Sequence, residues 1–174
     1  MSHIGTFSPS SFWVFMNNHQ INMWERCLYQ GCHPDVYGWP KVWQEGIDIV
    51  VDVDGYEPVN LNQIPKGKIY LHWKIEDGDL PDLKDFNILV DFTCSALSRG
   101  KKVLVHCAAG QNRSALLTAA VLYKKYFAPE GKSGRDVYQY IKERNPLAFT
   151  NPVFKNFVLG SFQPTQSHFM RGLS

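Results

Sequence analysis

The chain has 174 residues, of which 44% are hydrophobic and 20% charged, and its formal net charge is +2. This length suits one domain with its own hydrophobic core, and the composition excludes a disordered chain and a nucleic-acid-coating one. No apolar run reaches the roughly 18 to 20 residues of a bilayer-spanning helix, and the first residues lack the features of a secretory signal. We therefore expect no membrane span and a cytoplasmic location, with a nuclear one still open.

The predicted strands are short and rich in β-branched residues. Residues 47–53 and 68–75 are bounded by Gly, Pro or Asp, which is typical of strands in a covered sheet. Residues 103–106 form a short apolar run, as in a strand buried on both faces. Residues 27–31 are a candidate edge strand. The aromatic-rich first two dozen residues match no element, and they either pack on the domain or bind a partner.

Helical patterns fill the remaining chain. Apolar residues recur at helical spacing over residues 81–98, and Gly100 follows as a natural end of the helix. Further helices are predicted over residues 115–127, from a capping box of Ser133 and Asp136 onward, and from Asn151 and Pro152 onward.

Strands that alternate with helices predict an α/β fold with a sheet covered by helices. Ligands of such sheets bind beyond the C-terminal ends of the strands. We expect three parts of the chain: an N-terminal extension of residues 1–25 with undefined packing, a folded domain of residues 26–160, and a frayed polar tail of residues 161–174.

The loop after the strand at 103–106 has the composition of an anion site. It begins at Cys107 and enters the next helix at Arg113, so its backbone N–H groups point inward at a helix N-terminus. Gly110 suits a backbone conformation that other residues resist, and small neighbours let the backbone approach a ligand closely. The residues predicted to bind the anion are Ala108, Ala109, Gly110, Gln111 and Asn112.

The same loop favours an ionised cysteine. A free thiol is only a few per cent ionised at neutral pH, whereas inward amides, a helix dipole and an arginine all stabilise the thiolate. These donors would also hold the equatorial oxygens of a phosphoryl group, with Arg113 gripping two of them and the Cys107 sulfur in line with the leaving oxygen. The residues therefore predict nucleophilic attack on a phosphate.

The segment HCAAGQNRS, residues 106–114, resembles the H-C-x5-R-S/T signature of the cysteine-based protein tyrosine phosphatases. A match at all five fixed positions is expected by chance in on the order of one in 10⁴ to 10⁵ chains of this length. The small dual-specificity branch of this family is also resembled by ED at 76–77, GKKVLVHCAAG and ALLTAAVLY. The segments LYQG and NPVFKNF resemble that branch more weakly. The resemblance covers roughly residues 27–159. It implies a single-domain protein-tyrosine-phosphatase-like fold with a mixed, mostly parallel sheet and a phosphate-binding loop between strand and helix.

The resemblance also implies a phosphocysteine mechanism that needs no metal or cofactor. Cys107 would be the nucleophile and Arg113 the clamp on the phosphate and on the transition state. Ser114 would supply a hydroxyl that helps the thiolate leave in the second step. His106 would support the loop through hydrogen bonds rather than by proton transfer.

A general acid must protonate the leaving oxygen, and the same carboxylate can then activate water. The family carries this aspartate roughly thirty residues before the cysteine, on a mobile loop. Asp77 lies thirty residues before Cys107 and precedes Gly78, so it is the expected acid. Asp79 and Asp82 are the alternatives, and Asp82 is also a candidate helix cap.

A second string, IVVDVDG at residues 49–55, resembles the opening motif of the haloacid dehalogenase superfamily. In that family Asp52 would be the nucleophile and Asp54 the acid and base beside a magnesium ion. Tyr56 stands where that family has Thr or Val, and the later acidic cluster comes too soon. We therefore interpret the segment as a strand end and a loop, with Tyr56 and Glu57 as candidate substrate contacts.

The four cysteines are expected to be free thiols, because a domain of this size needs no disulfides. Cys27, Cys32 and His33 lack a second pair of ligands at a familiar spacing, so no zinc site is expected. Cys94 is expected to be a buried structural residue, with a reversible disulfide to Cys107 left open.

The expected activity is hydrolysis of phosphotyrosine, and of phosphoserine or phosphothreonine, in a phosphorylated protein or peptide. The neutral loop side chains disfavour a highly anionic inositol phosphate. Asn112 and Arg113 resemble the ending of the loop in RNA 5′-triphosphatases, so that activity on an RNA 5′ end is one alternative. A phosphopeptide-binding module with weak catalysis is the other.

Overall fold

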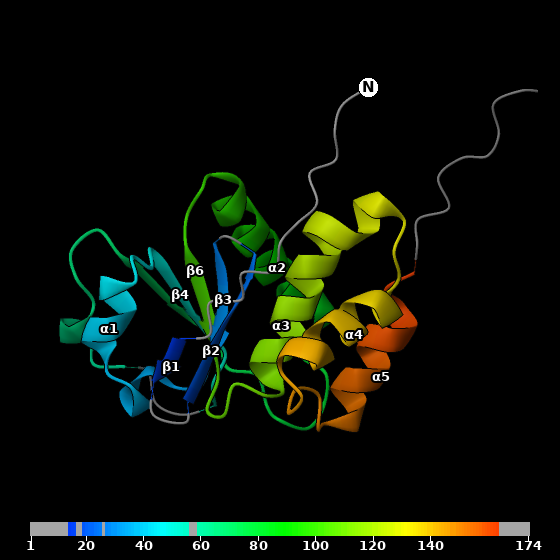
Figure 1. Cartoon of the computed structure of the whole chain (residues 1–174), viewed down its shortest axis with the longest axis horizontal. Coiled ribbons are helices and arrows are strands. Elements are labelled where there is room, and N and C mark those ends of the chain that lie inside the picture. The colour runs from blue at the N-terminus through cyan, green and yellow to red at the C-terminus, as the bar shows by residue number, and fades with distance from the viewer. Residues whose placement is uncertain (1–13, 17–18, 26, 56–58, 164–174) are drawn as a thin grey trace, which may run out of the picture.

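The computed structural model describes residues 14–16, 19–25, 27–55 and 59–163, so most of the expected N-terminal extension and tail lies outside the described residues. The described chain forms a six-stranded sheet in the order β1-β2-β3-β6-β4-β5 (Figure 1). β1, β2 and β3 pair antiparallel, whereas β3, β6, β4 and β5 pair parallel. The strands are β1 Val14–Met16, β2 His19–Glu25, β3 Leu28–Gly31, β4 Ile49–Asp52, β5 Ile69–His72 and β6 Val103–His106.

The strand predictions are largely confirmed, and one placement was wrong. Residues 103–106 form β6 as predicted, while β4 and β5 are shorter than residues 47–53 and 68–75. β3, within residues 27–31, is not an edge strand, because β2 pairs with one side of it and β6 with the other. The sequence pattern missed β2, and without β2 the next strand seemed to end the sheet.

The C-terminal ends of the parallel strands lie side by side. In the strand pairing, His106 lies opposite Gly31 on one side and opposite Asp52 on the other, and Asp52 lies opposite His72. The loops that follow these strands therefore meet at one edge of the sheet, where ligands of parallel sheets bind.

Helices lie on both faces of the sheet (Figure 1). α2 and α3 pack on one face, α4 and α5 pack against α3, and α1 packs on the other face. Among the described residues, no helix has the length and the apolar character needed to cross a bilayer. The helices are α1 Trp39–Gln44, α2 Leu83–Ser98, α3 Arg113–Leu122, α4 Gly134–Arg144 and α5 Pro152–Ser161, with a π-helical turn at Tyr123–Phe127 and 3₁₀ turns at Pro34–Val36, Leu61–Gln63 and Ala128–Glu130.

The helix starts follow the predicted capping residues. Asp82 caps α2 by accepting from two backbone amides, so this rival for the acid role has a structural task. Ser133 and Asp136 form the capping box of α4, and Asn151 caps α5, both as predicted. α3 begins at Arg113, where the loop was expected to enter the helix, so the arginine belongs to the first turn of the helix.

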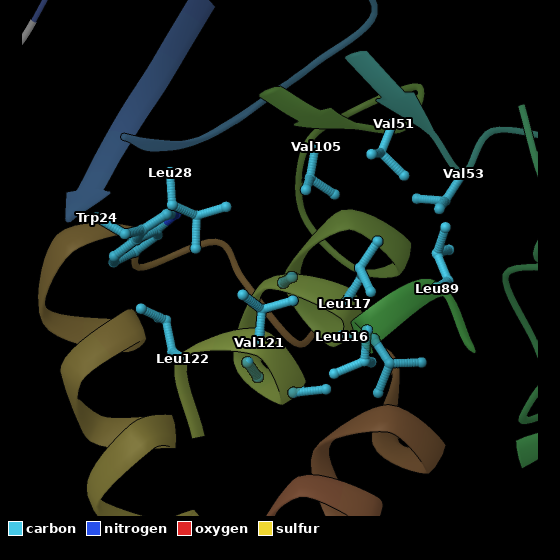
Figure 2. Close-up of a cluster of buried hydrophobic side chains, with 14 of the residues drawn as sticks. Trp24, Leu28, Val51, Val53, Leu89, Val105, Leu116, Leu117, Val121 and Leu122 are labelled. Atoms are coloured by element: carbon cyan, nitrogen blue, oxygen red, sulfur yellow. The ribbon is translucent and has the colours of Figure 1, made fainter. Parts of the chain in front are cut away.

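Hydrophobic side chains pack on both faces of the sheet, and α3, the helix that follows the loop, lies within one of the two clusters. Alternate residues of a strand face opposite sides: Val51, Val53 and Val105 face the helices α2 and α3, whereas Val50 and Leu104 face α1. Figure 2 shows the first of these clusters, in which side chains of the sheet pack onto α3. Every residue of α3 is buried, as expected for a central helix that is covered all round.

Candidate active site

The loop between β6 and α3 brings a thiol and a hydroxyl together. Cys107 is 2% exposed and Ser114 is fully buried. The Cys107 Sγ and the Ser114 Oγ lie 3.3 Å apart, within hydrogen-bonding reach. The two side chains that the sequence assigned to nucleophile and leaving-group support are thus in contact.

The carbonyl groups of the loop are held by donors outside it. The backbone amide of His33 donates to Ala108 O at 3.1 Å, and the amide of Phe149 donates to Gln111 O at 3.0 Å. Gly110 O accepts from the side chain of Gln30 at 2.8 Å and from that of Asn145 at 3.2 Å. In a trans peptide the N–H points opposite to the C=O, so these outward carbonyls turn the following amides toward the centre of the loop. This orientation of the backbone is compatible with the predicted anion-binding concavity, whose role in binding stays a prediction.

Gly110 is required at its position for two reasons. Its φ of +70° lies in the left-handed region, which glycine adopts without a steric penalty. A β-carbon here would lie 2.7 Å from the carbonyl carbon of Gly31, so β3 packs directly against the loop backbone.

Arg113 forms a buried ion pair that the sequence reading missed. Its Nη1 lies 2.8 Å from Asp54 Oδ1, and the Asp54 side chain is 1% exposed. From the sequence, Asp54 was expected to belong either to a magnesium-binding motif or to a loop. In the structure Asp54 pairs with a cation, and the described residues contain no group of three His, Cys, Asp or Glu that could hold a metal ion. Tyr56 and Glu57 lie outside the described residues.

Asp77 accepts hydrogen bonds from two asparagines, one in the loop and one at the start of α5. Asn112 Nδ2 donates to Asp77 Oδ2 at 3.1 Å, and Asn151 Nδ2 donates to Asp77 Oδ1 at 3.1 Å. Asp77 is exposed, and so is Asp79, which makes no hydrogen bond or ion pair with another described residue. Of the candidate acids, Asp77 is therefore the one that the fold holds beside the loop.

His106, the residue before Cys107, is buried among aromatic rings. The ring is fully buried, neither nitrogen has a hydrogen-bond partner among the described residues, and it packs edge to face against His33 and Trp39. Burial, and to a smaller extent His33, lowers the pKa of His106 to about 3, so the ring is neutral. The Nδ1 atom of His106 lies 3.7 Å from Asp52 Oδ1, and support of the loop through hydrogen bonds stays a prediction.

Two supporting residues could not be found from the sequence. Gln30 is fully buried in β3, where its Oε1 accepts from Trp24 Nε1 at 3.1 Å. Asn145 follows α4 and reaches the loop from there. A glutamine within an apolar strand is a weak sign of a buried hydrogen-bond network, and nothing in the sequence distinguishes Asn145.

The four cysteines are free. Cys94 is partly buried, with its Sγ 3.9 Å from Val121 O on α3. Cys32 is buried on the segment that packs against the loop, and burial raises the pKa of its thiol. The reversible disulfide between Cys94 and Cys107 stays a prediction.

These features define a class of protein. A buried thiol, a hydroxyl and an arginine gather in one strand-to-helix loop at the C-terminal edge of a parallel sheet, as the resemblance to the cysteine-based phosphatases implies. A family model described as "Dual specificity phosphatase, catalytic domain" matches residues 28–162. The chain belongs to this family.

Curated relatives support the assignment. The chain is 30% identical over 125 residues to human dual specificity protein phosphatase 16. The matched residues make up 71% of this chain and 18% of the relative. It is 34% identical over 79 residues to tyrosine-protein phosphatase pmp1 of Schizosaccharomyces pombe. The matched residues make up 45% of this chain and 26% of that protein. The chain thus spans no more than 26% of the length of these two relatives.

Solved structures confirm the predicted fold. Tk-PTP in its active form is similar with a TM-score of 0.70 at 23% identity, over 81% of this chain and 94% of that one. Human DUSP28 is similar with a TM-score of 0.65 at 22% identity, over 79% of this chain and 89% of that one. The single-domain α/β fold expected from the sequence, with its mixed and mostly parallel sheet, is therefore correct.

Proposed function

We propose that the chain hydrolyses phosphotyrosine, and also phosphoserine and phosphothreonine, in phosphorylated proteins or peptides through a phosphocysteine intermediate. The observation that carries this proposal is the hydrogen bond from Asn112 to Asp77. It joins a residue of the loop that contains Cys107 to the carboxylate expected to act as acid. This contact between separate segments supports the proposal that Cys107 and Asp77 act at one site.

In the first step, the Cys107 thiolate attacks phosphorus. The S–P bond forms as the bond to the leaving oxygen breaks, and Asp77 gives its proton to that oxygen. In the second step, Asp77 accepts a proton from water, whose oxygen bonds to phosphorus as the S–P bond breaks. Ser114 Oγ, 3.3 Å from the sulfur, donates to the departing thiolate. Arg113 and the loop amides hold the equatorial oxygens in both steps.

The charges around the loop favour a substrate with one phosphoryl group. The loop carries no lysine, and the buried carboxylate of Asp54 offsets the charge of Arg113. Polyanionic inositol phosphates and RNA 5′-triphosphates would meet less positive potential here than a site rich in lysine provides. A cytoplasmic location is part of the same proposal, and the four free thiols are compatible with it.

The decisive experiment measures hydrolysis of 4-nitrophenyl phosphate in the presence of a chelator. We expect wild-type turnover, no turnover with Cys107→Ser, and loss of about 10²-fold or more in kcat with Asp77→Asn. Asp79→Asn is the matched control, because it removes an exposed carboxylate two residues away that makes no hydrogen bond or ion pair with a described residue. Turnover that survives Cys107→Ser, or that requires magnesium, would refute the mechanism.

The substrate class is tested on the active protein. Phosphotyrosyl, phosphothreonyl and phosphoseryl peptides and triphosphorylated RNA are compared at equal concentration. Faster hydrolysis of the RNA would favour a 5′-triphosphatase instead. A wild type that binds phosphopeptide without turning it over would favour the binding module.

A further inference from the structure

The DVDG segment at the end of β4 lies against the phosphate-binding loop, and the mechanism above assigns no role to it. Asp52 ends β4 and Asp54 follows two residues later, with both side chains buried. The Asp54 carboxylate accepts a hydrogen bond from Arg113 Nη1 at 2.8 Å. A carboxylate so well shielded from water is retained at a substantial desolvation cost, and its position beside the clamp suggests a role in orienting the arginine.

The ion pair occupies one part of the guanidinium and leaves another part available. Arg113 Nε is buried and has no hydrogen-bond partner among the described residues. A guanidinium presents five N–H donors in a rigid plane. A carboxylate bound at Nη1 therefore fixes the direction in which the unpaired Nε–H points. This buried and unpaired donor lies at the end of the phosphate-binding loop, where it can donate to an acceptor of the substrate, such as a phosphoryl oxygen.

Asp54 is itself held rigidly. Its backbone amide donates to Asp52 Oδ1 at 2.8 Å, and its Oδ1 also accepts from the amide of Gly55 at 2.7 Å. The hydroxyl of Tyr70 on β5 donates to Asp52 Oδ2, and burial raises the pKa of Tyr70, so this donor keeps its proton. The contacts form a chain from Tyr70 through Asp52 and Asp54 to Arg113.

Gly55 completes this arrangement. A β-carbon at Gly55 would lie 3.4 Å from Arg113 Nη1, at van der Waals contact, so the turn after Asp54 passes close to the guanidinium. The pattern Asp-x-Asp-Gly thus has a physical use here that differs from its use around a magnesium ion. The first aspartate accepts from the amide of the second, the second binds the arginine, and the amide of the glycine donates to the second aspartate.

We propose that Asp54 is a positioning residue that orients Arg113 for the transition state, with Asp52 and Tyr70 as its support. This inference rests on the proposed function, since it names how one catalytic group of that site is aligned. A guanidinium that is already oriented loses less side-chain entropy when the phosphoryl group binds. It also presents its donors without reorganisation as charge develops in the transition state.

A double-mutant cycle of Asp54→Asn and Arg113→Lys tests the coupling, with kcat and KM measured on 4-nitrophenyl phosphate. Asn keeps the shape of the side chain and removes its charge. We expect Asp54→Asn to lower kcat by about tenfold or more in the wild-type background and by less than about threefold in the Arg113→Lys background. KM should change little, because loss of orientation and loss of a repelling charge act in opposite directions on phosphate binding.

Two further variants separate positioning from general structural damage. Tyr70→Phe removes the hydrogen bond to Asp52 and should lower kcat less than Asp54→Asn, with no further effect in the Asp54→Asn background. Asp91→Asn removes the carboxylate of an exposed ion pair with Lys124 and should leave kcat unchanged. If Asp54→Asn does not fold, Tyr70→Phe carries the test, and a Tyr70→Phe variant with wild-type kcat would then overturn the proposal.

Other outcomes are also decisive. An Asp54→Asn variant with wild-type kcat and tighter binding of inorganic phosphate would show that the carboxylate only offsets charge. Additive effects of Asp54→Asn and Arg113→Lys would also overturn the proposal. If the wild type does not turn over 4-nitrophenyl phosphate, the proposed function fails by itself. The same cycle is then measured by calorimetry on inorganic phosphate, where coupling of about threefold or more supports positioning, and additivity or absence of binding refutes it.

Discussion

Gly110 and Gly31 touch through their backbones, with the site of a β-carbon on Gly110 only 2.7 Å from the carbonyl carbon of Gly31. The contact joins the phosphate-binding loop to the end of β3. It leaves no space for any side chain at position 110, and the φ of +70° at the same residue disfavours one independently.

Gly110→Ala is therefore expected to destabilise the fold by about 2 kcal/mol or more and to abolish activity, because the loop must move away from β3. Gly100→Ala is the matched control. Its φ of +73° is nearly the same, but nothing lies within 4 Å of its β-carbon. Only the backbone strain of about 1 kcal/mol remains there. Urea denaturation of both variants measures the difference, and equal losses of stability would contradict the packing argument.

The contact between Asn151 and Asp77 predicts a selective effect on catalysis. Asn151→Ser keeps a good capping side chain for α5 but removes the amide that donates to Asp77 Oδ1. We expect kcat to fall by about threefold to tenfold, with the larger loss on phenyl phosphate than on 4-nitrophenyl phosphate. The poorer leaving group depends more on a well-placed acid.

Asn60→Ser provides the control for this prediction, since Asn60 caps a 3₁₀ turn through the same kind of bond. It should leave the ratio of the two rates unchanged. An equal loss on both substrates with Asn151→Ser would mean that Asn151 acts only through the stability of α5.

Ser114→Ala is expected to slow the second step more than the first. The hydroxyl lies 3.3 Å from the Cys107 sulfur, and in the proposed mechanism it stabilises the thiolate as it leaves the phosphocysteine. Rapid mixing with 4-nitrophenyl phosphate should then give a burst of about one 4-nitrophenolate per chain. Ser114→Thr retains a hydroxyl and should show a smaller burst or none. A lower kcat without a burst would place the role of Ser114 in the first step.

His106 predicts a dependence of stability on pH. Its pKa is lowered from 6.5 in the unfolded chain to about 3 in the fold by burial. Between these values the unfolded chain binds a proton that the folded chain does not, so stability falls with decreasing pH, by about 1.4 kcal/mol per unit. Above pH 6.5 both states are neutral and the ring contributes no pH dependence.

The variant His106→Gln should show a flatter fall in stability between pH 6 and 4, because it removes this proton linkage. Chemical denaturation at several pH values measures both slopes. Parallel slopes for the wild type and the variant would mean that the buried ring takes up a proton without unfolding.

Much of the fold could be predicted because its signals are local. Short stretches of sequence predicted β6 and the capping residues of α2, α4 and α5, and the structure contains each of them. The error at β3 arose because the status of a strand as edge or interior depends on whether another strand pairs with it. That partner, β2, belongs to a segment without a clear alternating pattern.

The sequence by itself determined which residues lie together in the proposed phosphate-binding loop. Cys107, Gly110, Arg113 and Ser114 lie within eight consecutive residues, so chain connectivity alone brings them to one turn. Only the tertiary structure decided what surrounds that turn. Asp54 reaches it from the turn after β4, and Asn151 from the N-cap of α5. Strand register and helix packing bring these distant segments together, and short-range patterns do not encode such contacts.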